Sequence, residues 1–126
     1  MSGYAFDSNI VIDALAGFEP AMSEMERCAT GGGRLWVSRM VWVEILSKGS
    51  VGALRASEAF LNGFGVDEVD AEIAFRAAAL RRERPRLKAP DAIILASALM
   101  RGRILVTRNI KDFPAATPGV RIPYTF

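Results

Sequence analysis

Short apolar segments alternate in this chain with longer segments that carry helix signals. The predicted strands are residues 4–6, 35–37, 66–69, 104–106 and 120–122. Helices are expected between them, at about residues 9–16, 21–30, 39–48, 54–62, 71–84 and 90–100. Strands that alternate with helices build an α/β domain whose sheet is mainly parallel. The alternation therefore predicts the fold class before any single residue is considered.

Capping residues and helix breakers predict where the helices begin and end. Ser8 and Ser38 each precede a predicted helix and are expected to cap it. Gly17 and Pro20 are expected to close the first helix. Pro90 is expected to open the last helix, where its missing N–H costs nothing. That helix is apolar on nearly every side, which predicts that it is buried.

The composition is that of a globular chain, and residues 1–126 are expected to form one domain. Hydrophobic residues make up 51% of the sequence and charged residues 24%, which excludes a disordered chain. No apolar run approaches the length of about 20 residues that spans a membrane. The first residues lack the features of a signal peptide. Cys28 is the only cysteine, so a reducing, cytoplasmic setting is expected.

The sequence contains no histidine, the residue most often used as a general base near neutral pH. This excludes nucleophilic systems of the Ser/His/Asp and Cys/His types. If the chain is a hydrolase, a metal-bound water is the natural nucleophile, because a metal ion lowers the pKa of water without an imidazole.

Four acidic residues lie near predicted strand ends or helix starts. Asp7 directly follows the first strand, and Asp112 lies in the loop after the fourth strand. Asp91 is in the first turn of the last helix, and Glu44 lies nearly two turns into the helix after the second strand. Ligands of open α/β sheets bind beyond the carboxyl ends of the strands, and Mg²⁺ prefers carboxylate oxygens. We therefore expect these acids to meet at one edge of the sheet as a metal site.

Each acid also has an alternative interpretation that needs no metal. Asp7 would cap the first helix, and Asp91 would interact favourably with a helix macrodipole. Glu44 would lie on the solvent face of an amphipathic helix, and Asp112 would be an ordinary turn residue. Asp13 is expected to be an exposed helical acid and is left out of the predicted site.

Four stretches of the chain resemble motifs of the PIN-domain family, and in particular of the VapC toxins of bacterial VapBC toxin–antitoxin pairs. They occur in family order: FDSNI at residues 6–10, SRMVWVE at 38–44, APDAIILASA at 89–98 and VTRNIKDF at 106–113. The resemblance covers nearly the whole chain. It implies a PIN-like three-layer α/β/α fold with a central, mainly parallel sheet of four or five strands.

The resemblance also implies endoribonuclease activity that depends on Mg²⁺ or Mn²⁺. Asp7, Glu44 and Asp91 occupy the family's three most regular acid positions, and Asp112 matches a fourth position that varies more. These acids are expected to act as catalytic residues and metal ligands, with hydrolysis by a metal-activated water. The positions that orient the acids or the water are matched by Thr107 and Asn109.

Partners follow from the same resemblance. Toxins of this type form homodimers, and a cognate VapB-like antitoxin blocks the site with a C-terminal segment. Known substrates are structured RNAs such as tRNA or rRNA, and no residue of this sequence chooses among them. The implied function is that of the toxin of a type II toxin–antitoxin system, with no membrane partner.

A basic segment is a candidate for contact with RNA. Six basic residues between Arg76 and Lys88 are opposed by one acid, Glu83, and arginine binds phosphate oxygens in pairs. The alternative is a solvated helix end, and Arg108 is either a phosphate contact or a solvated loop charge. The arginines predicted to contact RNA are Arg81, Arg82, Arg84, Arg86 and Arg108.

Two other classes of protein share these features. A receiver-like phosphoacceptor domain also carries acids at strand ends, but it needs paired acids after the first strand and a lysine after the last. Asp7 stands alone at its strand end, and no such lysine follows. The other alternative is a catalytically silent RNA- or protein-binding module on a PIN-like fold. Clustered acids argue against that module, because negative charge repels phosphate.

Overall fold

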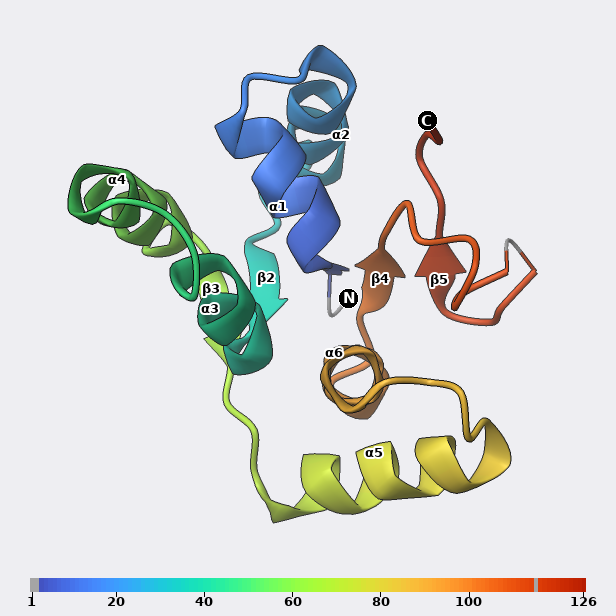
Figure 1. The fold of residues 1–126 in the computed structure, drawn as a ribbon. Helices are drawn as coiled ribbons and strands as arrows, with labels where there is room; N and C mark the ends of the chain where they lie inside the picture. Colours follow the sequence, from blue (N-terminus) through green and yellow to red (C-terminus); the bar gives the residue numbers. More distant parts are fainter. Residues whose placement is uncertain (1–2, 115) are drawn as a thin grey trace.

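The computed structural model describes residues 3–114 and 116–126, and a parallel sheet forms its centre (Figure 1). The strands are β1 (Tyr4–Phe6), β2 (Leu35–Ser38), β3 (Gly65–Asp67), β4 (Ile104–Val106) and β5 (Val120–Arg121). Their order across the sheet is β3-β2-β1-β4-β5, and every neighbouring pair is parallel. This confirms the predicted α/β fold and its sheet.

Helices cover both faces of the sheet, which gives the domain three layers (Figure 1). They are α1 (Ser8–Leu15), α2 (Glu19–Ala29), α3 (Arg39–Leu46), α4 (Val51–Leu61), α5 (Ala71–Glu83) and α6 (Ala89–Met100). In Figure 1, α1 and α2 lie on one side of the sheet, and α5 and α6 lie on the other. Strands covered on both faces are apolar on both, and Phe6, Val37 and Leu105 are accordingly fully buried.

Some predicted helix boundaries are wrong. The N-cap of α1 is Asp7, and Ser8 is already in the first turn, where its amide donates to the Asp7 carboxylate over 2.7 Å. Pro20 does not close α1 but lies in the first turn of α2, which begins at Glu19. Proline is tolerated there because that turn leaves amides unpaired anyway. α4 begins three residues earlier than predicted because the Ser50 hydroxyl caps it.

Other local predictions are confirmed. Ser38 caps α3 by accepting a hydrogen bond of 3.2 Å from the Met40 amide. Pro90 lies in the first turn of α6. This helix is the buried one, with Ala92 and Ala96 fully enclosed where it packs against β2 and β4. None of the helices in the described ranges is long and apolar enough to cross a membrane.

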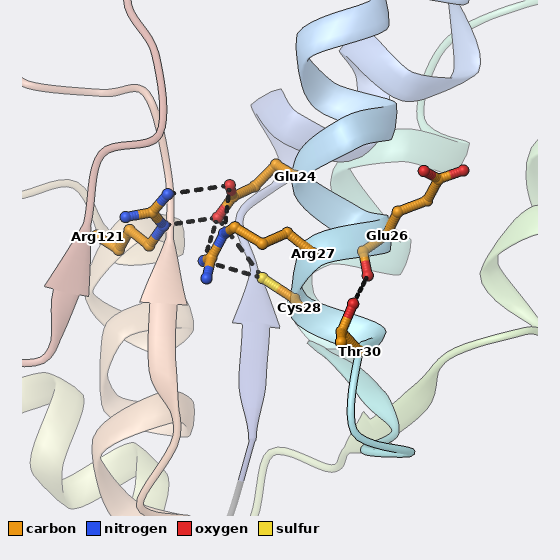
Figure 2. Close-up of polar contacts among 6 residues, drawn as sticks. All are labelled: Glu24, Glu26, Arg27, Cys28, Thr30 and Arg121. Atoms are coloured by element: carbon orange, nitrogen blue, oxygen red, sulfur yellow. Dashed lines mark hydrogen bonds and ion pairs between the residues drawn. The ribbon is translucent and has the colours of Figure 1, made fainter.

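An ion cluster ties the edge strand β5 to α2 (Figure 2). The carboxylate of Glu24, in α2, is 5% exposed and accepts hydrogen bonds from Arg27 over 2.9 Å and from Arg121, in β5, over 2.7 Å. Burial alone would raise the pKa of Glu24, but the two guanidinium groups outweigh it and lower the pKa to about 2. The cluster therefore attaches a two-residue strand through side chains as well as through backbone pairing.

Candidate functional site

The site begins where two neighbouring strands end. β1 and β4 pair in parallel, so the residues that follow them, Asp7 and Thr107, lie side by side at one edge of the sheet. The Asp7 amide donates to the Val106 carbonyl over 2.9 Å. The hydroxyl of Thr107 donates to Oδ2 of Asp7 over 2.7 Å, and both side chains are buried.

Asp7 has two roles in this geometry, because it caps α1 with Oδ1 and faces the edge of the sheet with Oδ2. Burial raises its pKa, and the negative charge of Glu44 adds to the effect. Hydrogen bonds from Thr107 and Ser8 lower the pKa, but they do not cancel the rise. The capping interpretation is therefore correct, and it does not exclude Asp7 from a cluster of acids.

Glu44 reaches this edge from α3. Its Oε1 accepts a hydrogen bond of 2.5 Å from the hydroxyl of Ser8. The amide of the same serine donates to Asp7. One serine thus bridges the two carboxylates, and Glu44 is only half-buried, not fully turned to solvent as its alternative interpretation required.

Asp91 reaches the edge from the first turn of α6. Its pKa is raised to about 6, first by burial and then by the negative charges of Asp7, Asp112 and Glu44. A hydrogen bond with Asp112 adds to the rise. The other three predicted acids therefore lie within electrostatic reach of Asp91, although the four come from separate segments of the chain.

Asparagine and threonine side chains hold the fourth acid in place. The Asn109 side-chain amide donates to Oδ2 of Asp112 over 2.9 Å, and its carbonyl oxygen accepts from the Asp112 amide over 3.2 Å. The backbone amide of Asn109 in turn donates to Oγ1 of Thr107 over 3.1 Å. Sequence reasoning missed Asn9, whose side chain donates to the same Thr107 oxygen over 3.2 Å. Its position two residues after Asp7 was the available signal.

The donor set fits a hard divalent cation in chemistry, but the side chains are not arranged around one. In the described part of the chain, no group of three or more acidic or cysteine side chains is placed to hold a metal ion. Three of the carboxylates each accept a hydrogen bond from a neighbouring side chain. The Asp7 carboxylate accepts one from Thr107. The Glu44 carboxylate accepts one from Ser8, and the Asp112 carboxylate accepts one from Asn109. Side-chain rotation would be needed to bring their oxygens together.

Asp13 is not the exposed acid that was expected. It is 7% exposed and accepts hydrogen bonds of 2.6 and 3.1 Å from Arg108. The Tyr124 hydroxyl donates to it over 2.7 Å. The Arg108 guanidinium also lies 4.1 Å from the centre of the Phe126 ring. Arg108 is therefore not a solvated loop charge, and its amide donates to the Asn9 side chain over 3.3 Å, next to the carboxylates.

The basic segment divides into residues that contact the protein and residues that do not. Arg81 donates to the Leu87 carbonyl over 3.0 Å, and Arg84 donates to the Asp112 carbonyl. The side chains of Arg82 and Arg86 are exposed and make no hydrogen bond or ion pair with described residues. The solvated-helix interpretation therefore applies to only part of the segment.

Comparisons with known proteins agree with this geometry. The sequence profile of the PIN domain matches residues 4–116. A chain of a toxin–antitoxin complex from Klebsiella pneumoniae is 35% identical, with a TM-score of 0.86 over 98% of this chain and 99% of that one. A DNA-bound VapBC structure from Salmonella typhimurium gives 24% identity and a TM-score of 0.79, over 99% of this chain and 98% of that one. Comparison with curated proteins found no match.

A parallel sheet covered by helices, with acids gathered at the carboxyl ends of its strands, places the chain in the class of α/β proteins whose functional site lies at that edge of the sheet. The chain belongs to the PIN-domain family, whose toxin members are nucleases. The family match and the similar structures confirm the resemblance to VapC-type toxins that the sequence motifs indicate.

Proposed function

We propose that this protein is a divalent-metal-dependent endoribonuclease and the toxin of a type II toxin–antitoxin pair. The observation that carries the proposal is the convergence of Asp7, Glu44, Asp91 and Asp112 at one edge of the sheet. Burial and then the negative charges of Asp7, Asp112 and Glu44 raise the pKa of Asp91 to about 6, which supports this convergence. Uncompensated negative charge of this kind is what a bound cation neutralises.

Each acid has a defined place in the proposed chemistry. Asp7, Glu44, Asp91 and Asp112 would hold Mg²⁺ or Mn²⁺, which supplies an activated water and stabilises charge on the phosphate and leaving oxygen when it is bound. Thr107 keeps Asp7 oriented through its 2.7 Å hydrogen bond. Asn109 does the same for Asp112 with paired side-chain and backbone contacts.

The proposed partners follow from the similar structures. These are described as toxin–antitoxin and VapBC complexes. We propose that this chain likewise binds a VapB-like antitoxin, which covers the acidic edge. We also propose that the chain itself forms a homodimer and acts in the cytoplasm. The proposed substrate is a structured RNA such as tRNA or rRNA.

Cleavage of total RNA by purified, antitoxin-free protein tests the proposal. We expect discrete cuts with Mg²⁺ or Mn²⁺ and none with EDTA. Asp7→Asn keeps a residue that can cap α1 and should abolish the cuts. Glu72→Gln removes an exposed acid from α5 and should leave them unchanged. Cutting that survives both EDTA and Asp7→Asn would identify a contaminant. A folded protein that cuts no RNA with any metal would favour the catalytically silent binding module.

A further inference from the structure

A basic cavity of about 780 Å³ opens beside the acidic edge. It lies between the α5–α6 connection and the loop that follows β4. Four of its lining residues are cationic and one is a carboxylate. The lining residues are Arg84, Pro85, Arg86, Leu87, Lys88, Lys111 and Asp112.

The walls of this basic cavity are held by specific contacts. Leu87 is 2% exposed, its amide donates to the Arg84 carbonyl over 2.9 Å, and its own carbonyl accepts from Arg81. Arg84 crosses from one wall to the other, because its guanidinium donates to the Asp112 carbonyl and lies 5.9 Å from the ring centre of Phe113. Contacts of Arg81, Arg84 and Leu87 therefore fix the two sides of the cavity relative to each other.

Three of the cations are available to a ligand. Arg86, Lys88 and Lys111 are exposed, and none of them makes a hydrogen bond or ion pair with the residues that the structure describes. They come from two segments that are far apart in sequence, and they line one concave surface. Several unpaired cations around a cavity of this size favour a phosphate-bearing ligand.

The basic cavity adjoins the acidic edge through a shared residue. Asp112 lines the cavity, and hydrogen bonds through Asn109 and Thr107 connect it to Asp7. A chain of phosphodiesters that presents one phosphate to the carboxylates can therefore place a neighbouring phosphate in the cavity.

We propose that the basic cavity binds a phosphodiester of the RNA strand next to the one that is cleaved. This rests on the proposed nuclease function and deepens it. It differs from the prediction made from the sequence, because it adds Lys88 and Lys111 and leaves out Arg82, which does not line the cavity. It also leaves out Arg108, whose guanidinium is paired with Asp13.

A binding measurement without cleavage tests the cavity separately from the activity. The probe is a fluorescein-labelled single-stranded RNA, titrated with the protein in EDTA and followed by anisotropy between about 50 and 200 mM salt. The cavity variant carries Arg86→Gln, Lys88→Gln and Lys111→Gln. The control variant carries Arg34→Gln, Arg55→Gln and Arg76→Gln, which removes the same charge from exposed positions outside the cavity.

We expect the cavity variant to lose roughly tenfold or more in affinity, and its salt slope to fall by about 0.7, because one phosphate contact to a single strand contributes about that much. The control variant should lose much less. Lys111→Gln alone should show part of the loss, which guards against misfolding of the triple variant. Equal losses in the two triple variants, or no binding by the wild type, would overturn the proposal.

Cleavage assays show whether the cavity proposal or the nuclease proposal has failed. If the wild type cuts RNA and both triple variants cut with the same KM, the cavity proposal fails and the nuclease stands. If the wild type cuts nothing but the cavity variant binds RNA less well than the control, the nuclease fails and the cavity remains a phosphate-binding site.

Discussion

The hydroxyl of Thr107 donates a 2.7 Å hydrogen bond to the carboxylate of Asp7, a residue 100 positions away in the sequence. The pair joins the end of β4 to the end of β1. The same oxygen accepts hydrogen bonds from the Asn9 side chain and from the Asn109 amide. One buried hydroxyl therefore connects the segments that carry two of the four acids.

Replacing this hydroxyl should destabilise the protein. Thr107→Val keeps the shape of the side chain but leaves the buried Asp7 carboxylate with one donor fewer. Hydrogen bonds to charged groups contribute about 1.5–3 kcal/mol, and we expect a loss of that size in the free energy of unfolding, measured with urea near neutral pH. Thr125→Val, at an exposed position, should change it by less than about 0.5 kcal/mol. Equal effects would mean that the hydrogen bond does not stabilise the fold.

Asp91 should make stability fall as pH rises. Its folded pKa of about 6 lies above the ordinary value of 3.8, so the folded chain binds a proton that the unfolded chain releases. The contribution of Asp91 to stability is therefore lost between pH 3.8 and about 6, at a cost of about 1–2 kcal/mol after allowance for solvent screening. Asp91→Asn should remove this loss, leaving the metal-free protein as stable as the wild type or more so above pH 6.

Urea unfolding of both proteins in EDTA, below and above this pH range, measures the effect. Glu72→Gln, an exposed acid on α5, serves as the control and should follow the wild type. A variant Asp91→Asn that is clearly less stable than the wild type above pH 6 would show that Asp91 is a structural residue.

Divalent cations should stabilise the folded chain if the acids bind one. A ligand at 100 times its Kd contributes about 2.7 kcal/mol, which raises Tm by several degrees in a domain of this size. We expect thermal unfolding to shift upward with millimolar Mg²⁺ in the wild type and in Glu72→Gln. The shift should be much smaller in Asp91→Asn. Identical shifts in all three proteins would show that the cation acts elsewhere on the molecule.

The Glu24 cluster should stabilise the protein mainly above pH 4.5. The folded pKa of Glu24, about 2, lies below its ordinary value of 4.5, so its contribution is complete above 4.5 and is lost as pH falls towards 2. Its arginine partners are 46% and 41% exposed, so we expect Glu24→Gln to cost only about 1–2 kcal/mol near pH 6. The loss of unfolding free energy caused by Glu24→Gln should be smaller near pH 3.

The neighbouring acid offers a matched control for this prediction. Glu26 lies on the same helix but is exposed, and its side chain points away from the cluster (Figure 2). Glu26→Gln should leave the urea midpoint unchanged at both pH values. A Glu24→Gln cost that does not depend on pH would indicate lost packing instead of a lost charge interaction.

Local sequence determined the elements of this fold and the positions of its acids. Apolar runs predict β1, β2 and β4, because strands buried on both faces must be apolar throughout. The Ser38 cap depends on a neighbour two residues away and is predicted correctly, whereas α1 is capped by Asp7 and not by the predicted Ser8. Asp7 was predicted at a strand end because parallel strands present their carboxyl ends at one edge of the sheet.

Tertiary structure alone decided which charged groups meet. Asp13 was expected to be an exposed helical acid, yet its partner Arg108 lies 95 residues away in the sequence, and Arg121, the partner of Glu24, lies 97 residues away. The basic cavity likewise brings Lys111 to the α5–α6 connection. Local propensity carries no information about such pairs. They form because the packed layers bring distant segments together, and burying a charge is tolerated only where a partner is present.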